Sequence, residues 1–460
     1  MSLRIDSEIR QDEKMTHSQY AELIMNNTPF RTLPDTKETL VKINGVYVSR
    51  GEIEIERQCQ VLIPNCSTYM VQQVIKTIQR STYTDRERFD RFPHLINLQN
   101  GVFDIRTWEL REQRSSDLFR IQFPITYDPF AGPEKFMKFL MDCLPDYKDR
   151  ITVLEEMASL FLRGLKLEKI YMHVGDGENG KSTIFSVIEA ISGKKNMAHI
   201  SIHDLINHRF ARAGLDGKIV NTYAEISNQE LKQLGVVKAL VSGDPIDVEK
   251  KGKDAFTMEN SARMFYAAND LPEIANFKHA ELRRFLVTKW SEQFKANPTQ
   301  EELNQGIKKR DINLKKELCK KEELSGILNL LLFHAKKLLE NEKFTYEQQT
   351  KQLQKEWQEK TDHIQEFVEN CLIREEGSSA KSSVYQAYKN WCIENKLISK
   401  SERELNSKIK KSFDDTRVKI GGKTTVVWTN MSLGYPVTQV TLSTVPKTKE
   451  NNLVSSKNVQ

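Results

Sequence analysis

Apolar residues in the middle of the chain recur in short runs that predict buried strands. The run Ile170–Val174 is followed by a Gly-rich polar segment, and Thr183–Ile191 then repeats apolar residues at helical spacing. Further apolar runs, each ending at polar or turn-forming residues, are Lys218–Glu225, Ala262–Asn269 and Leu282–Val287. This alternation predicts an α/β core, which we place at residues 134–294, after the Pro-rich turn at 127–133.

Residues 1–133 show a different pattern and predict an α+β accessory domain. The stretch before residue 40 is polar, and the first strand signal, Leu40–Val48, contains Asn44-Gly45, which favours a type I′ hairpin turn. Helical spacing runs from Ile53 to about Gln79, and Leu95–Ile121 has the pattern of short strands.

The residues after the core fall into three stretches. Residues 295–360 are charged with a helical apolar stripe, and predict a helical connector or lid. Residues 361–432 predict three helices and a hairpin at Gly421-Gly422, which is a winged helix-turn-helix; Ser383 with Gln386 and Ser399 with Glu402 are its expected capping boxes. Residues 433–460 are polar without a period, so we expect a disordered tail.

The polar segment between the first strand and its helix matches the nucleotide-binding pattern G-x-x-x-x-G-K-[ST] without a mismatch. Its glycines allow backbone N–H groups to face phosphates, Lys181 would neutralise the β- and γ-phosphates, and the Ser182 hydroxyl would hold Mg²⁺. We therefore expect ATP and Mg²⁺ as cofactors. The predicted nucleotide-binding residues are Gly175, Asp176, Gly177, Glu178, Asn179, Gly180, Lys181, Ser182 and Thr183.

Three further positions are candidates for catalysis. Glu225 ends a predicted strand and would polarise the attacking water, although Ala224 stands where many NTPases have a Mg²⁺-binding Asp. Asn269 ends another strand and would sense the γ-phosphate, unless it only starts a turn. The pair Arg283 and Arg284 is either a solvated basic edge or an arginine finger for a neighbouring subunit.

Two groups of residues are candidates for contact with DNA. Residues 246–256 predict two short strands around a basic tip, which is either a solvated hairpin or a finger that presents lysines to phosphates. The third helix and hairpin of the winged module would read duplex DNA, although such modules also bind proteins. The predicted DNA-binding residues are Lys250, Lys251, Lys253, Arg403, Asn406, Lys408, Lys410, Lys411 and Lys423.

Composition narrows the classes of protein only slightly. The net charge is +6, from 69 Lys and Arg against 63 Asp and Glu, so affinity for nucleic acid must come from local patches. The six cysteines show neither zinc-ligand spacing nor a disulfide framework. We see no apolar leader and no run long enough to span a bilayer, and expect a protein of the host-cell cytoplasm or nucleoid without membrane contact.

These motifs, in this order, resemble superfamily 3 helicases, specifically the helicase part of phage, plasmid and poxvirus primase-helicases and of mobile-element replication initiators. Residues 35–430 share the resemblance, which includes Asn100–Asp104 and the stretches Leu215–Asn221 and Ser242–Pro245. It implies a AAA+ P-loop core in a homo-hexamer, with single-stranded DNA in the pore. The acidic residue replaced by Ala224 departs from many members, and we expect no primer synthesis because no primase or zinc module precedes the core.

The sequence therefore predicts an ATP-dependent hexameric DNA helicase for replication initiation or fork unwinding of a viral, plasmid or integrated mobile element. Its partners would be single-stranded DNA in the pore, duplex origin DNA at the winged helix, and a separate primase or polymerase. One alternative is a AAA+ DNA-binding ATPase that remodels or loads without unwinding. Another is an ATP-switched transcriptional regulator, which the set Lys181, Glu225 and Asn269 disfavours.

Overall fold

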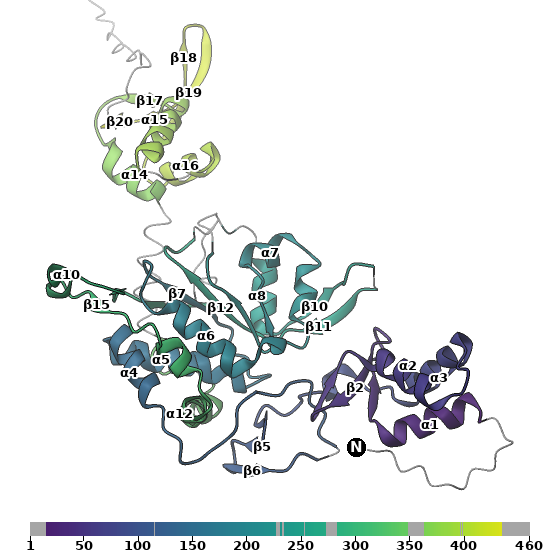
Figure 1. Ribbon diagram of the computed structural model, residues 1–460. Coiled ribbons are helices and arrows are strands. Elements are labelled where there is room, and N and C mark those ends of the chain that lie inside the picture. Colours follow the sequence, from purple (N-terminus) through teal and green to yellow (C-terminus); the bar gives the residue numbers. More distant parts are fainter. Residues whose placement is uncertain are drawn as a thin grey trace, which may run out of the picture. The chain divides into compact units, whose positions relative to one another are not determined.

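A computed structural model divides the 460-residue chain into two compact units, Met1–Lys355 and Glu356–Gln460. Figure 1 shows the helices and strands of both units. The predicted tail at 433–460 lies outside the described residues except for its first two positions. The described residues are 15–114, 116–226, 231, 234–252, 254–272, 283–347, 363–395, 397 and 399–434.

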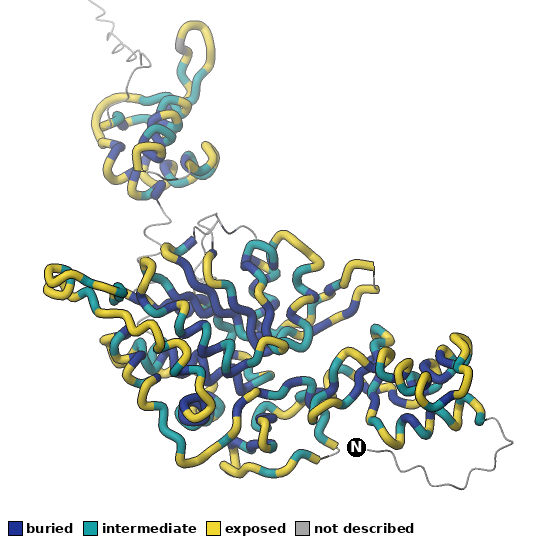
Figure 2. The backbone as a smooth tube through the Cα atoms, viewed as in Figure 1, coloured by how far each residue is buried: buried dark blue, intermediate teal, exposed yellow. Residues whose placement is uncertain are grey.

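A five-stranded sheet in which all paired strands run parallel forms the centre of the first unit. Its strands, in spatial order, are β13 (Phe285–Lys289), β7 (Ile170–Val174), β12 (Arg263–Ala268), β9 (Val220–Tyr223) and β8 (Met197–Ala198). The strands are nearly continuous runs of buried residues, drawn dark blue in Figure 2, as expected for a parallel sheet covered on both faces. The predicted α/β core is confirmed.

Helices complete the core of this unit. Those that pack with the sheet are α4 (Glu134–Cys143), α5 (Tyr147–Ala158) with the 3₁₀ turn η2 (Ser159–Phe161), α6 (Lys181–Ser192) and α12 (Lys321–Asn341). The apolar stripe of α12, including Ile327, Leu331 and Ala335, lies fully buried in the same cluster as Leu286 of the sheet. Gly326 permits this packing, because a Cβ there would lie 2.2 Å from the backbone of Gly132.

The N-terminal part (described residues 15–133) contains two small antiparallel sheets. Their strands are β1 (Phe30–Thr32), β2 (Thr39–Ile43) and β3 (Val46–Val48), then β4 (Leu95–Leu98), β5 (Gly101–Asp104) and β6 (Glu109–Arg111). The predicted hairpin turn is confirmed, since Asn44 and Gly45 both have positive φ, 50° and 84°. The helices of this part are α1 (His17–Asn27), α2 (Gly51–Leu62), α3 (Thr68–Ser81) and the turn η1 (Arg86–Arg88).

The first helix and strand of this part, α1 and β1, were not predicted. Both fall in the stretch before residue 40, whose polar composition gives no clear helical or strand period. A capping box between Thr16 and Gln19 starts α1, and the helix buries only Ala21 and Ile24.

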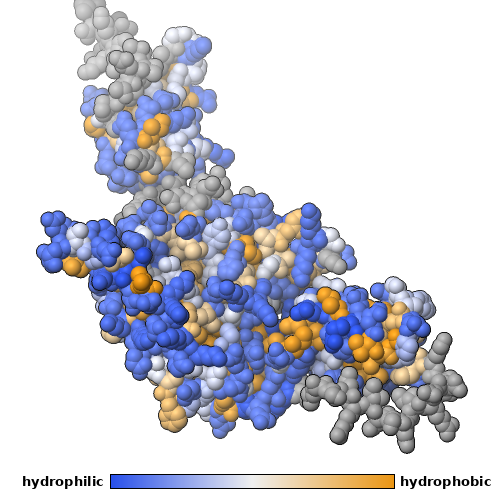
Figure 3. Space-filling model, viewed as in Figure 1, coloured by the Kyte–Doolittle hydropathy of each residue, from blue (hydrophilic) through white to orange (hydrophobic). Residues whose placement is uncertain are grey.

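At the surface, Figure 3 shows apolar residues gathered over the N-terminal part, where Ile53 and Val61 are more than half exposed.

The remaining elements of the first unit are short. Between β7 and β13 lie η3 (Lys194–Asn196), α7 (Ile202–Asn207), η4 (Ala211–Leu215), α8 (Gly235–Ser242) and an antiparallel hairpin of β10 (Pro245–Val248) and β11 (Phe256–Glu259). After β13 come β14 (Phe294–Lys295), α10 (Gln300–Asn304), β15 (Lys308–Lys309) and α11 (Leu314–Leu318). The stretch expected to be purely helical thus also contains the parallel pair of β14 and β15.

The second unit has its own apolar core, formed by three helices and an antiparallel hairpin. Its elements are α14 (His363–Cys371), β16 (Leu372–Ile373), β17 (Ser378–Ala380), α15 (Lys381–Glu394), α16 (Glu402–Ile409), β18 (Asp415–Ile420), β19 (Lys423–Thr429) and β20 (Ser432–Leu433). The predicted turn at Gly421-Gly422 is confirmed by positive φ at both residues. Both predicted caps are wrong: α15 begins at Lys381 without a side-chain cap, and the capping box of α16 is Ser401 with Glu404.

Among the described helices, none combines the length and the apolar composition that crossing a membrane requires. All six cysteines carry free thiols.

Candidate functional site

The predicted strand, loop and helix around the nucleotide-binding pattern are confirmed. β7 ends at Val174, and α6 begins at Lys181. Gly180 precedes the helix with φ of 98°, and a Cβ there would lie 2.6 Å from Sγ of Cys143. Only glycine fits this position, because both the backbone conformation and the space exclude a side chain. The loop is therefore shaped as a cradle that a nucleotide's phosphates can approach closely.

Lys181 points its side chain back into this loop and is only 9% exposed. Its Nζ donates to the backbone carbonyl of Gly175 and lies 3.2 Å from Oδ1 of Asn179 and 3.4 Å from the carbonyl of Asp176. Burial lowers the pKa of the Lys181 amine, and Asp176 partly opposes that effect. The amine is thus held at the mouth of the helix by acceptors that a phosphate group can replace.

Trp290, one residue beyond β13, contacts the loop and holds it in place. The sequence did not predict this role. The backbone carbonyl of Trp290 accepts a hydrogen bond of 3.1 Å from Nδ2 of Asn179, and a Cβ on Gly175 would lie 2.1 Å from that oxygen. Its backbone N–H donates to the carbonyl of Val174 at 2.7 Å. The sequence signal for it was slight, a tryptophan just after the apolar run that follows the arginine pair.

A cavity of about 580 Å³ lies beside the loop, large enough for a nucleotide. Ser182 and Thr183 line it on one side, with Glu178 at the loop. Arg310 reaches from the segment after β15 to within 3.4 Å of the Glu178 carboxylate. The cavity's apolar lining comes from Phe139, Phe294, Ile312 and Leu314. Its cations are Lys135, Lys138, Lys309, Arg310 and Lys315, and its carboxylates are Asp142, Glu178, Asp311 and Glu317. Such a mixture suits a planar base joined to an anionic phosphate chain.

The structure brings Glu225 and Asn269 to the same edge of the sheet as the loop. β9 and β12 are neighbours, Glu225 lies two residues after β9 ends, and Asn269 directly follows β12. A backbone hydrogen bond joins the loop to this end of the sheet, because the N–H of Gly175 donates to the carbonyl of Ala268 at 3.3 Å. Both candidate side chains are exposed. Carboxyl ends of parallel strands are where α/β proteins place ligands and catalytic groups.

Arg283 and Arg284 lie where the strands of the sheet begin, whereas Lys181 lies beyond the end where the strands finish. They precede β13, and the carbonyl of Arg284 accepts from the N–H of Ile170, where β7 begins. Each guanidinium lies 3.4 Å from Glu168, but Arg283 has 60% of its side chain exposed and Arg284 only 14%. Within one subunit these arginines are therefore not part of the loop's site.

The predicted basic hairpin is confirmed as two antiparallel strands, β10 and β11, and the end of the hairpin that carries the turn contacts the N-terminal part. The guanidinium of Arg86 lies 4.6 Å from the ring centroid of Phe256, and Nζ of Lys250 lies 3.8 Å from Glu38. Lys251 is exposed at the tip, and Lys253 lies outside the described residues. Lys250 thus already has a carboxylate nearby, which leaves Lys251 as the described lysine most open to an approaching phosphate.

The predicted DNA contacts of the second unit lie on α16, in the turn directly after it, and in the hairpin. Arg403, Lys410, Lys411 and Lys423 are exposed, whereas Asn406 and Lys408 are half-buried. Nζ of Lys410 lies 3.7 Å from Asp415, which partly neutralises it. These side chains can meet phosphates or base edges, and that role stays a prediction.

Metal binding would rest on few protein groups. Across the described residues, no three His, Cys, Asp or Glu side chains are grouped so that they could hold a metal ion. Ser182 is the second residue of α6 and lines the cavity beside the loop, which suits a magnesium ion bound together with phosphates. Ala224 contributes no ligand side chain.

Three family models match parts of the chain. A "D5 N terminal like" family matches residues 14–145, a "Poxvirus D5 protein-like" family matches residues 359–439, and a "family of unknown function" matches residues 173–284. The apo A form of the NrS-1 C-terminal region has a TM-score of 0.49 at 9% identity, and covers 91% of this chain and 100% of that one.

Curated proteins that resemble this chain include several from viruses. "Putative helicase 121R" of invertebrate iridescent virus 3 is 24% identical over 361 residues, which cover 71% of this chain and 38% of that protein. "Putative helicase 184R" of invertebrate iridescent virus 6 is 24% identical over 266 residues, or 53% and 26% of the two chains. "Putative primase C962R" of African swine fever virus is 22% identical over 239 residues, or 48% and 25%.

The chain thus spans well under half the length of these relatives. The family matches near both ends of the chain, taken with the viral relatives named as helicases and primases, confirm the resemblance to poxvirus D5-type primase-helicases.

Proposed function

We propose that this chain is the ATP-hydrolysing motor of a DNA helicase that initiates or sustains replication of a virus, a plasmid or an integrated mobile element. The observation that supports this most directly is the meeting of Lys181, Glu225 and Asn269 at one edge of a parallel sheet. Phosphate binding, water activation and γ-phosphate sensing require groups at such an edge. The relatives named as helicases support the choice of DNA as substrate.

The residues around the loop fit ATP. Backbone N–H groups after Val174 and the start of α6 would bind the phosphates, and Lys181 would leave its loop carbonyls to pair with the β- and γ-oxygens. The neighbouring cavity would receive the base and ribose. Ser182 would hold Mg²⁺, which neutralises developing charge on the phosphates. Glu225 would take up the proton of the attacking water, while Asn269 would orient that water.

DNA would be engaged at two places. Lys251 at the hairpin tip, with Lys250 and Lys253, would grip single-stranded DNA in the pore of a homo-hexamer. The three helices and hairpin of the second unit would act as a winged helix-turn-helix, with α16 and Lys423 facing duplex origin DNA. In the hexamer, Arg283 or Arg284 would serve a neighbour's nucleotide, which agrees with their distance from Lys181 in their own subunit.

Strand displacement tests this function. The protein is incubated with forked duplexes that carry only a 3′ or only a 5′ tail, with ATP or a non-hydrolysable analogue. We expect ATP-dependent displacement from one of the two substrates. ATP hydrolysis that DNA stimulates without any displacement would instead indicate a loader or remodeller. DNA binding with ATP but no stimulated turnover would indicate an ATP-switched regulator.

A partner primase or polymerase would work beside this protein in the host cytoplasm or nucleoid.

A further inference from the structure

Three side chains in the core behind the nucleotide loop form a continuous polar row that the proposed chemistry does not use. Nε1 of Trp290 donates a hydrogen bond of 2.9 Å to Nδ1 of His173, and Nε2 of His173 lies 3.1 Å from the carboxylate of Glu156. His173 is on β7, Glu156 on α5, and both are fully buried. Trp290 is 1% exposed.

The hydrogen bond from Trp290 determines which ring nitrogen of His173 carries the proton. An indole N–H can only donate, so Nδ1 of His173 must accept and its proton must sit on Nε2, facing Glu156. The same ring cannot accept from Trp290 once both nitrogens are protonated. Burial raises the pKa of the Glu156 carboxyl, and the nearby His173 opposes that effect. The row therefore fixes the orientation of the indole through one specific tautomer.

The row continues directly into the loop. Trp290, oriented by its indole, presents its backbone carbonyl to Nδ2 of Asn179 at 3.1 Å. Oδ1 of Asn179 then lies 3.2 Å from Nζ and 3.4 Å from the backbone N of Lys181. A Cβ on Gly180 would lie 3.3 Å from the indole ring itself, so the ring also limits where the loop can sit. All of these contacts lie at the start of α6, where the phosphates would bind.

Placing a carboxylate and an imidazole in the core is costly for stability alone. Well-packed apolar residues of the same volume are often as stabilising as a buried ionisable pair, so the polar row calls for another purpose. The members come from three separate elements, α5, β7 and the end of β13, and all lead to the same loop. A fixed geometry for the lysine is what phosphoryl transfer demands, since small misplacements of such a group reduce the rate strongly.

We infer that Trp290, His173 and Glu156 are positioning residues that hold Asn179, and through it Lys181, in the geometry that ATP hydrolysis requires. This inference rests on the proposed function. None of the three would touch the nucleotide, so the row acts through the loop that Trp290 contacts, and through Asn179 in particular. Loss of the indole N–H should therefore lower the rate of hydrolysis more than it lowers the stability of the fold.

The test uses conservative variants of the full chain. Trp290→Phe keeps an aromatic ring and the backbone carbonyl but removes the indole N–H, together with part of the ring's volume. His173→Gln can still accept from Trp290 and donate to Glu156, whereas His173→Leu can do neither. Trp428→Phe is the matched control, because Trp428 is fully buried and, within the described part of the chain, its indole nitrogen has no hydrogen-bond acceptor. The kcat and KM for ATP are measured beside the thermal midpoint.

We expect kcat/KM to fall about tenfold in Trp290→Phe and His173→Leu, the effect of one lost buried hydrogen bond. His173→Gln should stay within about twofold of the parent, and Trp428→Phe should match it. If Trp290→Phe and His173→Leu only lower the thermal midpoint and keep the parent kcat/KM, the inference is wrong. Should Trp290→Phe fail to fold, the contrast between His173→Gln and His173→Leu decides. Wild-type turnover in Lys181→Ala would instead overturn the proposed function itself.

Discussion

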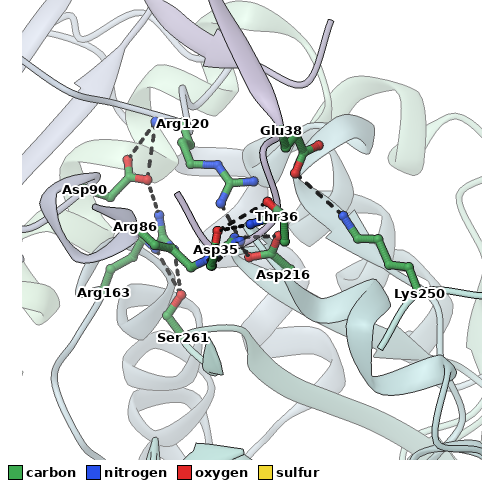
Figure 4. Close-up of polar contacts among 10 residues, drawn as sticks. All are labelled: Asp35, Thr36, Glu38, Arg86, Asp90, Arg120, Arg163, Asp216, Lys250 and Ser261. Carbon is green, nitrogen blue, oxygen red and sulfur yellow. Dashed lines mark hydrogen bonds and ion pairs between the residues drawn. The ribbon is translucent and has the colours of Figure 1, made fainter. Parts of the chain in front are cut away.

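Nη1 of Arg86 lies 3.0 Å from both carboxylate oxygens of Asp216. Arg86 belongs to the N-terminal part, and Asp216 precedes the strand β9 that leads to Glu225. Arg120 approaches the same carboxylate at 3.4 Å, and Arg86 also pairs with Asp35 at 2.9 Å (Figure 4). A second pair joins Arg163 to Asp90 at 2.6 Å. Because these side chains are largely buried, the N-terminal part is fixed to the sheet rather than loosely attached.

Replacing the central carboxylate of this cluster should destabilise the first unit. Asp216→Asn removes the carboxylate that faces Arg120 and leaves Arg86 with Asp35 alone, and we expect a loss of about 3 kcal/mol at neutral pH. Burial alone would raise the pKa of Asp216, but Arg120 and Arg86 outweigh it and hold that pKa below its usual value. Urea unfolding of parent and variant at a series of pH values measures the difference.

The sign of the pH effect follows from the lowered pKa. A carboxyl that is more acidic in the folded state stabilises it above the unfolded pKa of about 4, and this contribution disappears as pH falls through the folded pKa. The stability difference should therefore be full at pH 7 and shrink below about pH 4. Glu109→Gln, at an exposed position on β6, is the control. An equal difference at every pH would show that packing, not charge, dominates.

The hairpin tip offers a test of phosphate contact. Lys251→Ala should weaken binding to single-stranded DNA and reduce the slope of log affinity against log salt by about 0.7, whatever the DNA sequence. Glu38→Gln should act in the opposite direction, because it frees Lys250 from its neighbouring carboxylate. Lys316→Ala, an exposed lysine on α11, is the control. Unchanged binding in both hairpin variants would remove the tip from the DNA path.

The two arginines before β13 should differ in their effect on neighbouring subunits. Arg283 is mostly exposed and Arg284 mostly buried, so Arg283 is better placed to reach another subunit's nucleotide. Arg283→Ala should lose turnover by itself and regain part of it when mixed with Lys181→Ala, because a subunit that keeps Lys181 then receives the finger of a neighbour that keeps Arg283. Arg284→Ala should lose less turnover by itself. No recovery in the mixture would argue against a finger that acts between subunits.

The second unit should contribute to the choice of duplex DNA but not to turnover. Arg403→Ala combined with Lys411→Ala removes two exposed cations at α16. We expect this variant to lose the sequence preference that the parent shows when it selects from a random duplex library, with ATP turnover unchanged. Glu402→Gln is the control. If preference survives, this unit is a protein-binding module, and specificity lies elsewhere.

The local features of this chain were predictable and the long-range ones were not. The loop, its strand and its helix follow from neighbouring residues, as does the turn at Asn44-Gly45. Periodicity indicated the helix α12, but could not show that its apolar stripe completes the core of the sheet. The cap of α16 was misplaced because Ser399 and Ser401 each stand three residues before a Glu.

The parts of the site that the sequence did not reveal depend on partners far along the chain. Trp290 contacts Asn179 and His173, more than 100 residues away, and nothing local marks it as the seat of the loop. The same holds for Asp216 and Arg86, which are 130 positions apart. Arg283 and Lys181 lie at opposite ends of the strands because β13 pairs with β7 in parallel. The sequence alone does not show that pairing.

ATP turnover in the presence of single-stranded DNA, compared between the parent protein and Lys181→Ala, tests the central claim most directly. The amine of Lys181 sits inside the loop, so its loss should leave the fold and its thermal midpoint nearly unchanged. We predict that DNA-stimulated turnover falls on the order of 100-fold or more, since a charge that stabilises the transferring phosphoryl group is removed. Turnover at the parent rate in Lys181→Ala would contradict the assignment of this loop as the nucleotide site, and with it the proposed motor.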